Sequence, residues 1–167
     1  TINQLTFPAA PVAAAATVPG QTSFTANWGA VTSATDYYID VATDAGFANL
    51  LANYTNRKVT GSTSLAITGL TAGTLYYYQV RATNATGTSS SSNPVSQITV
   101  TLKPLNFRAT SVTSSGFVVQ WDAVAGAAGY QLDVQDGSSL ALIPGYDAKP
   151  VSSIITQVTG LTAGKLY

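Results

Sequence analysis

The chain contains 167 residues, of which 46% are apolar and 8% are charged, so it is long enough for one large globular domain or two small ones. Its seven acidic residues are all Asp, they balance seven scattered Lys and Arg residues, and this distribution disfavours nucleic acid as a partner. The sequence contains no Cys, His or Met, which excludes disulfides, thiolate or imidazole metal sites, and catalytic triads that depend on His.

The N-terminal segment TINQLTF is similar to PVSQITV at residues 94–100, which is the expected last strand of a first module. We therefore interpret residues 1–7 as the tail strand of a preceding module. The next segment, PAAPVAAAATV at residues 8–18, is the longest apolar stretch, but it is too short to span a bilayer and is interrupted by proline. No basic segment precedes it, so it does not have the pattern of a signal peptide, and we expect no membrane insertion.

Four further segments alternate apolar and polar residues with a period of two, which predicts half-buried β-strands. They lie at residues 24–28, 37–41, 65–67 and 76–82. Clusters of Gly, Asn and Asp separate them and supply turns, whereas Glu and a 3.6-residue apolar period are absent from the sequence, so little helix is expected. About seven short strands in about 92 residues fit an antiparallel sandwich of two sheets.

The second part of the chain repeats the first. Trp121 follows Trp28 by 93 residues, and Tyr130 follows Tyr37 by 93 residues. LTAGKLY at the C-terminus likewise follows LTAGTLY by 91 residues. The repeat predicts two modules of about 92 residues each, the first at residues 8–102 and the second, incomplete, at residues 103–167.

The residues Trp28 and Tyr37 and the run LTAGTLYYYQVRA at residues 70–82 resemble the fibronectin type III domain family, with Ala72 where that family usually has Pro. The resemblance covers nearly the whole chain and extends to Thr- and Ser-rich tandem modules of secreted or surface-attached bacterial proteins. It implies an all-β fold of tandem immunoglobulin-like antiparallel β-sandwiches. It also implies four structural residues, two in the core and two corner tyrosines whose hydroxyls bond to nearby backbone: Trp28, Trp121, Tyr76 and Tyr167.

The second module is expected to be truncated, because its sequence stops at the second corner tyrosine. The last two strands of a sandwich, which are called F and G in this family, follow the corner tyrosine in the first module. The inward residues of these strands in the first module are Tyr78, Val80, Ala82 and Ile98. At about 1.5–3 kcal/mol per large side chain, about 5–8 kcal/mol of burial would be missing, which is comparable to the whole stability of a small domain. Two explanations stay open: the chain is a window from a longer array, or a neighbouring copy supplies strands, as in donor-strand assembly.

Two pairs of carboxylates lie at matching places in the modules. Asp40 and Asp44 are in the first module, and Asp133 and Asp136 are in the second. Paired carboxylates at a loop can hold Ca²⁺, but the sequence contains no D-x-D-x-D-G run. We therefore expect ordinary turn and edge residues, with no metal, no cofactor and no catalytic pair.

The outward face of the strands around Tyr38 and Tyr77 is the candidate ligand-contact patch. It combines these tyrosines with Gln79 and Arg81, and Tyr54 lies on the segment between the two strands. Exposed aromatic rings beside amides can stack on sugar rings. Cross-strand tyrosine pairs also stabilise sheets without any ligand, and this second interpretation is the favoured one.

These observations predict a non-catalytic structural and adhesive spacer of an extracellular or cell-surface multimodular protein. One alternative is a subunit of a self-associating extracellular fibre that is completed by strands from a neighbour. Another is a carbohydrate-binding accessory module of a secreted enzyme. The expected partners are neighbouring modules of the same array, with other copies of the chain or surface glycans as further candidates.

Overall fold

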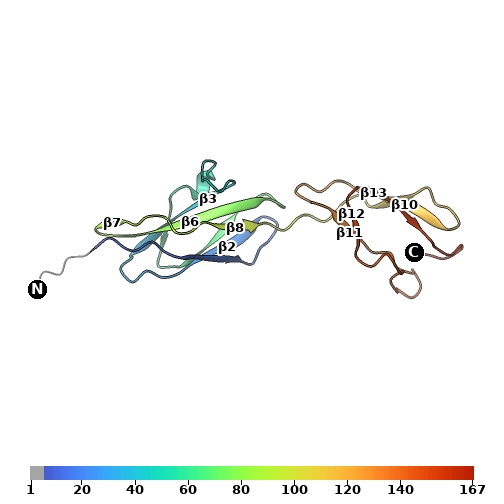
Figure 1. Ribbon diagram of the computed structural model, residues 1–167, viewed down its shortest axis with the longest axis horizontal. Coiled ribbons are helices and arrows are strands. Elements are labelled where there is room, and N and C mark those ends of the chain that lie inside the picture. Colours follow the sequence, from blue (N-terminus) through green and yellow to red (C-terminus); the bar gives the residue numbers. More distant parts are fainter. Residues whose placement is uncertain (1–5) are drawn as a thin grey trace, which may run out of the picture. The chain divides into compact units, whose positions relative to one another are not determined.

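The structure is a computed structural model that describes residues 6–167 (Figure 1). The chain divides into two compact units: unit 1 ends at Thr101, and unit 2 comprises Leu102–Tyr167. Both units are built from antiparallel strands, and the one helical turn within residues 6–167 is η1 (Ala52–Tyr54). The predicted all-β antiparallel fold is therefore confirmed. No helix of the described part is long and apolar enough to cross a membrane.

The tail strand expected at residues 1–7 falls mostly outside the described residues. Thr6 and Phe7, which the structure does describe, are not part of a strand. Unit 1 begins its regular structure at β1 (Ala13–Thr17).

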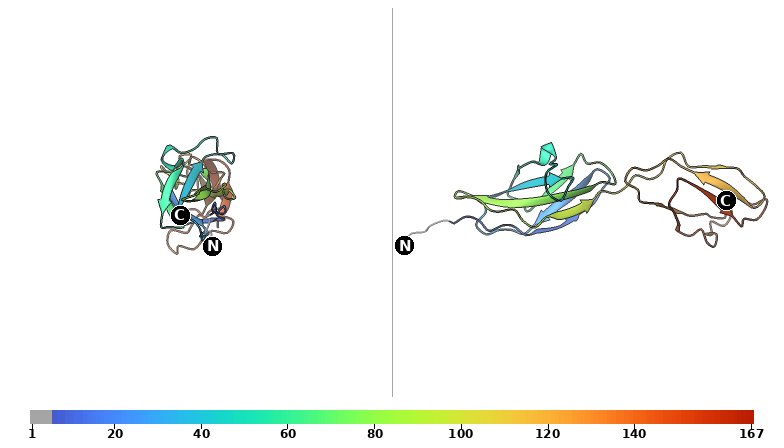
Figure 2. Two further views of the ribbon diagram at one scale, coloured as in Figure 1. Left: turned by 90° about the vertical axis from the view of Figure 1, so that its left-hand side faces the viewer. Right: turned by 45° about the horizontal axis from the view of Figure 1, so that its top comes forward.

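Unit 1 consists of two antiparallel sheets. The first has the order β1-β2-β5, with β2 at Ser23–Trp28 and β5 at Ser64–Thr68. The second has the order β4-β3-β6-β7, and β8 also pairs with β6. The bounds of its strands are β3 (Asp36–Ala42), β4 (Arg57–Thr60), β6 (Leu75–Asn84), β7 (Gly87–Thr88) and β8 (Val95–Ile98). The ten-residue strand β6, light green in Figure 2, therefore pairs with three other strands of its sheet.

The core of unit 1 comes from the inward residues of both sheets. Along β6 the side chains alternate between buried and half-buried from Tyr76 onward, as the period-two pattern requires. Tyr78 and Val80 are completely buried, and the Tyr78 ring lies 6.0 Å from the Phe24 ring of the other sheet. Each of these large side chains contributes about 1.5–3 kcal/mol of burial, so β6 is a major source of the stability of unit 1.

Two serines that lie between β7 and β8 in the chain accept hydrogen bonds from main-chain amides of β6 through their hydroxyls. The Val80 amide donates to Ser92 Oγ and the Ala82 amide donates to Ser89 Oγ, both at 3.0 Å. Ser92 is itself buried. The serine-rich run thus leaves the polar groups of β6 satisfied where regular pairing is interrupted.

Unit 2 repeats five of the strands of unit 1. One sheet has the order β13-β10-β9, with β9 at Arg108–Thr110, β10 at Gly116–Gln120 and β13 at Ile155–Thr159. The other contains only β11 (Tyr130–Leu132) and β12 (Lys149–Val151). By their pairing, β9, β10 and β13 match β1, β2 and β5, while β11 and β12 match β3 and β4. No described strand of unit 2 matches β6, β7 or β8.

The core of unit 2 is smaller than that of unit 1. Its buried side chains are Val119, Trp121, Leu132, Val134, Tyr146 and Val158. Several large apolar side chains of this unit are exposed, including Phe107 and Leu166. Unit 2 therefore has fewer buried apolar side chains in its core than unit 1.

Candidate functional site

The four residues of the predicted ligand-contact patch share one face of the β3–β6 pair. Tyr38 lies opposite Arg81, and Tyr77 lies opposite Ala42. All four patch residues, including Gln79, are half-buried. The register separates Tyr38 and Tyr77 by four positions along the strands, about 14 Å at 3.4 Å per residue. They therefore do not form a cross-strand pair.

A buried carboxylate lies at the centre of this patch. Asp40 accepts hydrogen bonds from Arg81 Nη2 at 2.8 Å and from Gln79 Nε2 at 3.4 Å. It also accepts one from the Asn56 amide at 2.6 Å, and its side chain is 9% exposed. Asp40 was expected at a turn or edge, but it lies inside β3, because a cation and an amide on the neighbouring strand compensate for its burial. The polar groups of the patch are directed at one another.

Asp44, by contrast, is a turn residue. Its carboxylate accepts hydrogen bonds from the amides of Ala48, Asn49 and Gly46 at 3.0, 2.7 and 3.1 Å. These bonds, with Ala48 and Asn49 as the largest causes, lower the pKa of Asp44 below its ordinary value. Asp40 and Asp44 thus serve separate networks. Within residues 6–167 no group of three or more acidic side chains converges as a metal site would require.

The two carboxylates of unit 2 also have separate partners. Asp133 accepts the Ala148 amide at 2.6 Å, as Asp40 accepts the Asn56 amide. Asp136 accepts the amides of Ser139 and Ser138 at 3.0 and 2.9 Å and lies 3.1 Å from Lys165 Nζ. The hydrogen bonds from Ser139 and Ser138, followed by that from Lys165, hold the pKa of Asp136 far below its usual range.

The corner tyrosines make the same hydrogen bond in both units. The Tyr76 hydroxyl accepts the Thr71 amide at 3.0 Å, and the Tyr167 hydroxyl accepts the Thr162 amide at 2.9 Å. Each bond closes the turn that precedes its tyrosine.

The two tryptophans lie in the two cores. Trp28 and Trp121 are each 4% exposed. Their rings lie 5.6 Å from Tyr37 and 5.2 Å from Tyr130, respectively. They therefore act as packing residues, and neither belongs to a surface site.

A further pair of tyrosines was not recognised from the sequence. The Tyr54 hydroxyl accepts the Thr68 amide at 2.8 Å, and the Tyr146 hydroxyl accepts the Thr159 amide at 2.8 Å. Tyr54 is buried, so it is not part of the patch with which the sequence associated it. The 92-residue spacing between Tyr54 and Tyr146 is the signal that would have revealed a structural pair.

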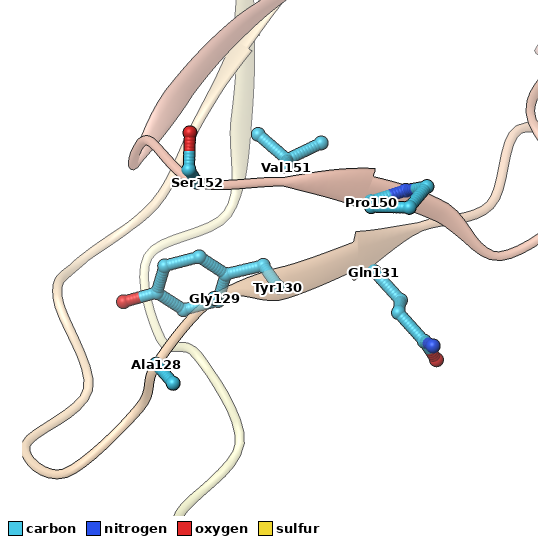
Figure 3. Close-up of a pocket in the computed structure, with 7 residues that line it drawn as sticks. All are labelled: Ala128, Gly129, Tyr130, Gln131, Pro150, Val151 and Ser152. Atoms are coloured by element: carbon cyan, nitrogen blue, oxygen red, sulfur yellow. The ribbon is translucent and has the colours of Figure 1, made fainter.

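Hollows occur at several places on unit 2. A shallow depression of about 700 Å³ lies at β11 and β12 (Figure 3). Figure 3 shows that Tyr130 and Gln131 point away from each other, and the Tyr130 hydroxyl already accepts the Val124 amide at 3.0 Å. The depression therefore has no convergent set of polar groups.

The second hollow is a cavity of about 360 Å³, which we call the unit 2 groove. It is lined mainly by apolar side chains from the segment around β9, from β10, from β11 and the residues after it, and from Leu166 and Tyr167. Its wall contains three buried core side chains and two partly buried ones that pack against the core: Val119, Leu132, Val134, Phe117 and Tyr167.

The sequence profile described as "Fibronectin type III domain" matches residues 9–98. The mouse protein "Fibronectin type III domain-containing protein 7" is 30% identical over 145 residues, which cover 87% of this chain and 18% of that protein. "Chitinase A1" of Niallia circulans is 29% identical over 116 residues, covering 64% of this chain and 15% of that protein. The chain thus spans less than a fifth of the length of these relatives.

Two solved structures are also similar to this chain. A two-domain fibronectin type III segment from chicken tenascin is 17% identical, with a TM-score of 0.49, over 95% of this chain and 85% of that one. The structure titled "Crystal Structure of FN3tt" is 23% identical, with a TM-score of 0.47, over 57% of this chain and 97% of that one.

Proposed function

Because the chain belongs to the fibronectin type III domain family, we propose that it supplies non-catalytic structural and adhesive spacer modules to an extracellular or cell-surface protein. The observation that carries this proposal is the repetition of one set of anchors. The Tyr76 and Tyr167 hydroxyls fix the same turn in the two units. The Tyr54 and Tyr146 hydroxyls hold the last residue of the equivalent strands β5 and β13. Each unit carries its own copy of these hydrogen bonds, as is expected of modules that are joined end to end.

A side chain connects the first and last strands of unit 1, which supports a mechanical role. The Ala13 amide donates to Asn93 Oδ1 at 3.0 Å, and Asn93 Nδ2 donates to the Ala13 carbonyl at 3.0 Å. Ala13 begins β1, and Asn93 precedes β8, which lies beside β1. A force applied to the two ends of unit 1 would act on these two hydrogen bonds together with the ladder of β1 and β2.

Stretching single molecules tests the spacer function. The intact chain is placed between two marker domains, and the unfolding force of unit 1 is compared with that of an Asn93→Ala variant. We expect a lower unfolding force for Asn93→Ala and an unchanged force for Asn53→Ala, which alters an exposed asparagine on η1. If unit 1 unfolds at forces close to the noise in the unsubstituted chain, it cannot transmit tension and the spacer function is wrong.

We propose polysaccharide contact as a second function, which the similarity to Chitinase A1 and the patch around Tyr38 and Tyr77 support. The two residues lie on the same polar face, about 14 Å apart along the strands. Co-sedimentation with insoluble chitin tests it, using the intact chain, a Tyr38→Ala, Tyr77→Ala double variant, and Leu75→Ala as a control at an exposed apolar site. No sedimentation of the unsubstituted chain removes this function and leaves the spacer function standing.

A further inference from the structure

We propose that the β6–β7 turn of unit 1 is a docking site for the C-terminal end of a preceding module of the same family, with Asn84 as the positioning residue. The turn lies at the end of unit 1 at which the described chain enters it (Figure 1). Two residues at the turn contact the segment that enters unit 1, residues 6–11, which we call the entry segment. This inference deepens the spacer function and rests on it, because it names the partner of one end of unit 1.

Asn84 is a buried polar residue that binds the entry segment. It ends β6 and is 9% exposed. Its Nδ2 donates to the Thr6 carbonyl at 2.9 Å and to the Ser33 carbonyl at 3.1 Å. Its Oδ1 accepts the amide and the hydroxyl of Thr86 at 2.9 and 2.6 Å. Because both donors of Thr86 point at Oδ1, the orientation of the side-chain amide is fixed, and Nδ2 is directed at the two carbonyls.

The aromatic ring of the entry segment lies against a glycine at the same turn. Gly87 begins β7, and a Cβ atom at this position would collide with the Phe7 ring. Glycine therefore makes room for the ring. Pro8 and Pro11, which follow in the entry segment, are buried, and each has a fixed φ. The entry segment is thus held by a hydrogen bond, by a ring contact and by two buried prolines.

The end of unit 1 shows why a carbonyl at this position is available to a following module. Thr6 and Phe7 correspond, 93 residues later, to Thr99 and Val100, which directly follow β8. The Thr74 amide donates to Thr99 Oγ1 at 3.0 Å rather than to the Thr99 carbonyl. In the described part of the chain, the Thr99 carbonyl accepts no hydrogen bond. A module that ends in the same way leaves free the carbonyl that the β6–β7 turn binds.

The other groups of these two end residues are bonded within their own module. Thr99 is 1% exposed, and its amide and hydroxyl donate to the Thr74 and Thr71 carbonyls at 3.0 and 2.6 Å. The Val100 amide donates to the Gly20 carbonyl at 2.9 Å. The same two residues would therefore end one module and contact the next. No free linker would separate the two modules, and the joint would be rigid.

Backbone order parameters of the intact chain, measured by NMR relaxation, test the contact itself. We expect values of about 0.85 for the amides of Thr6 and Phe7, as in rigid backbone. Asn84→Ala removes the donor to the Thr6 carbonyl, so both values should fall below about 0.6. Asn53→Ala, at an exposed asparagine of η1, is the matched control and should leave both values unchanged.

A tandem protein tests the partner. Residues 8–93 are placed directly before the intact chain, so that TINQLTF takes the place of PVSQITV in the added module. Residual dipolar couplings report whether the added module and unit 1 share one alignment tensor, as two rigidly joined bodies do. We expect one tensor for the unsubstituted tandem and two different tensors for Phe7→Ala at the joint. Val12→Ala, at an exposed apolar residue just after the entry segment, is the matched control and should retain one tensor.

Three results would overturn the proposal. The first is low order parameters of Thr6 and Phe7 in the unsubstituted chain, and the second is no change on Asn84→Ala. The third is an added module that does not fold, or that aligns independently of unit 1, because TINQLTF would then not end a docked module. If Asn84→Ala unfolds unit 1, Phe7→Ala in the tandem decides alone. A flexible joint with an unchanged unfolding force of unit 1 would refute the docking site and leave the spacer function standing.

Discussion

Units 1 and 2 share their local anchors but differ in how their cores are closed. Both have a buried Trp beside a Tyr, a corner tyrosine and a tyrosine hydroxyl that holds the strand opposite β2 or β10. Unit 1 also has β6, which completely buries Phe24, whereas the counterpart Phe117 remains half-buried in the groove wall. The comparison shows that the Trp–Tyr contacts and the tyrosine hydrogen bonds are the same in both units. In unit 1, one long central strand then supplies much of the buried area.

The largest expected effect comes from making unit 1 resemble unit 2. Tyr78→Ala removes a completely buried ring whose hydroxyl donates to the Ala14 carbonyl. We expect the free energy of unfolding of unit 1 to fall by about 3–5 kcal/mol, because a large cavity forms in the core. Chemical denaturation monitored by Trp28 fluorescence in a Trp121→Phe background measures it. The adjacent Tyr77→Ala, on the outward face, should cost about 1 kcal/mol or less. Equal losses would mean that β6 does not close the core.

The second effect concerns the ion pairs of the two units. Arg81→Ala leaves the buried Asp40 carboxylate without its cation, so we expect a loss of about 2–3 kcal/mol. Lys165→Ala removes the cation of Asp136 in unit 2, but the Lys165 side chain is 56% exposed, and we expect at most about 1 kcal/mol. Denaturation midpoints of the two variants, measured at low and high salt, test this difference. Similar losses for both would contradict it.

A smaller effect is expected at the corner tyrosines. Tyr76→Phe keeps the ring but removes the acceptor of the Thr71 amide, which should cost about 1 kcal/mol. Tyr167→Phe removes the same bond to Thr162 in unit 2, where Tyr167 is less buried, and should cost less. Hydrogen exchange of the Thr71 and Thr162 amides measures both. Tyr38→Phe is the control, since its hydroxyl has no partner among the described residues, and it should change neither rate.

The smallest effect is a pH dependence of the stability of unit 2. The pKa of Asp136 is lower in the folded than in the unfolded chain, so its ionised form stabilises the fold above the unfolded pKa of about 3.9. This contribution is lost as the pH falls through the folded pKa. The melting temperature of Asp136→Asn should therefore lie below that of the unsubstituted chain at pH 7, and the difference should shrink below about pH 4. Asp147→Asn should show no such trend. A constant difference between pH 7 and pH 2 would contradict the role of the Ser138 and Ser139 amides.

Much of the fold and little of the candidate patch could be predicted from the sequence. The alternation of residues 76–82 and the spacing of Trp28 and Trp121 predict strands and a repeated core, because side-chain period and repeat length are local properties. The purely structural interpretation of the patch stays a prediction, but the cross-strand pairing of Tyr38 with Tyr77 is not observed. It required the register of β3 against β6, and an offset along the strands is not visible in either segment alone.

The sequence by itself determined the all-β repeat and the positions of its tryptophans and corner tyrosines, because these depend on contacts between residues close in the chain or on simple periodicity. Only the tertiary structure decided that Asp40 is buried beside Arg81, 41 residues away, and that Tyr54 turns into the core. The physical reason is that burial of a polar group, or of a ring after a loop, depends on which distant strand covers it.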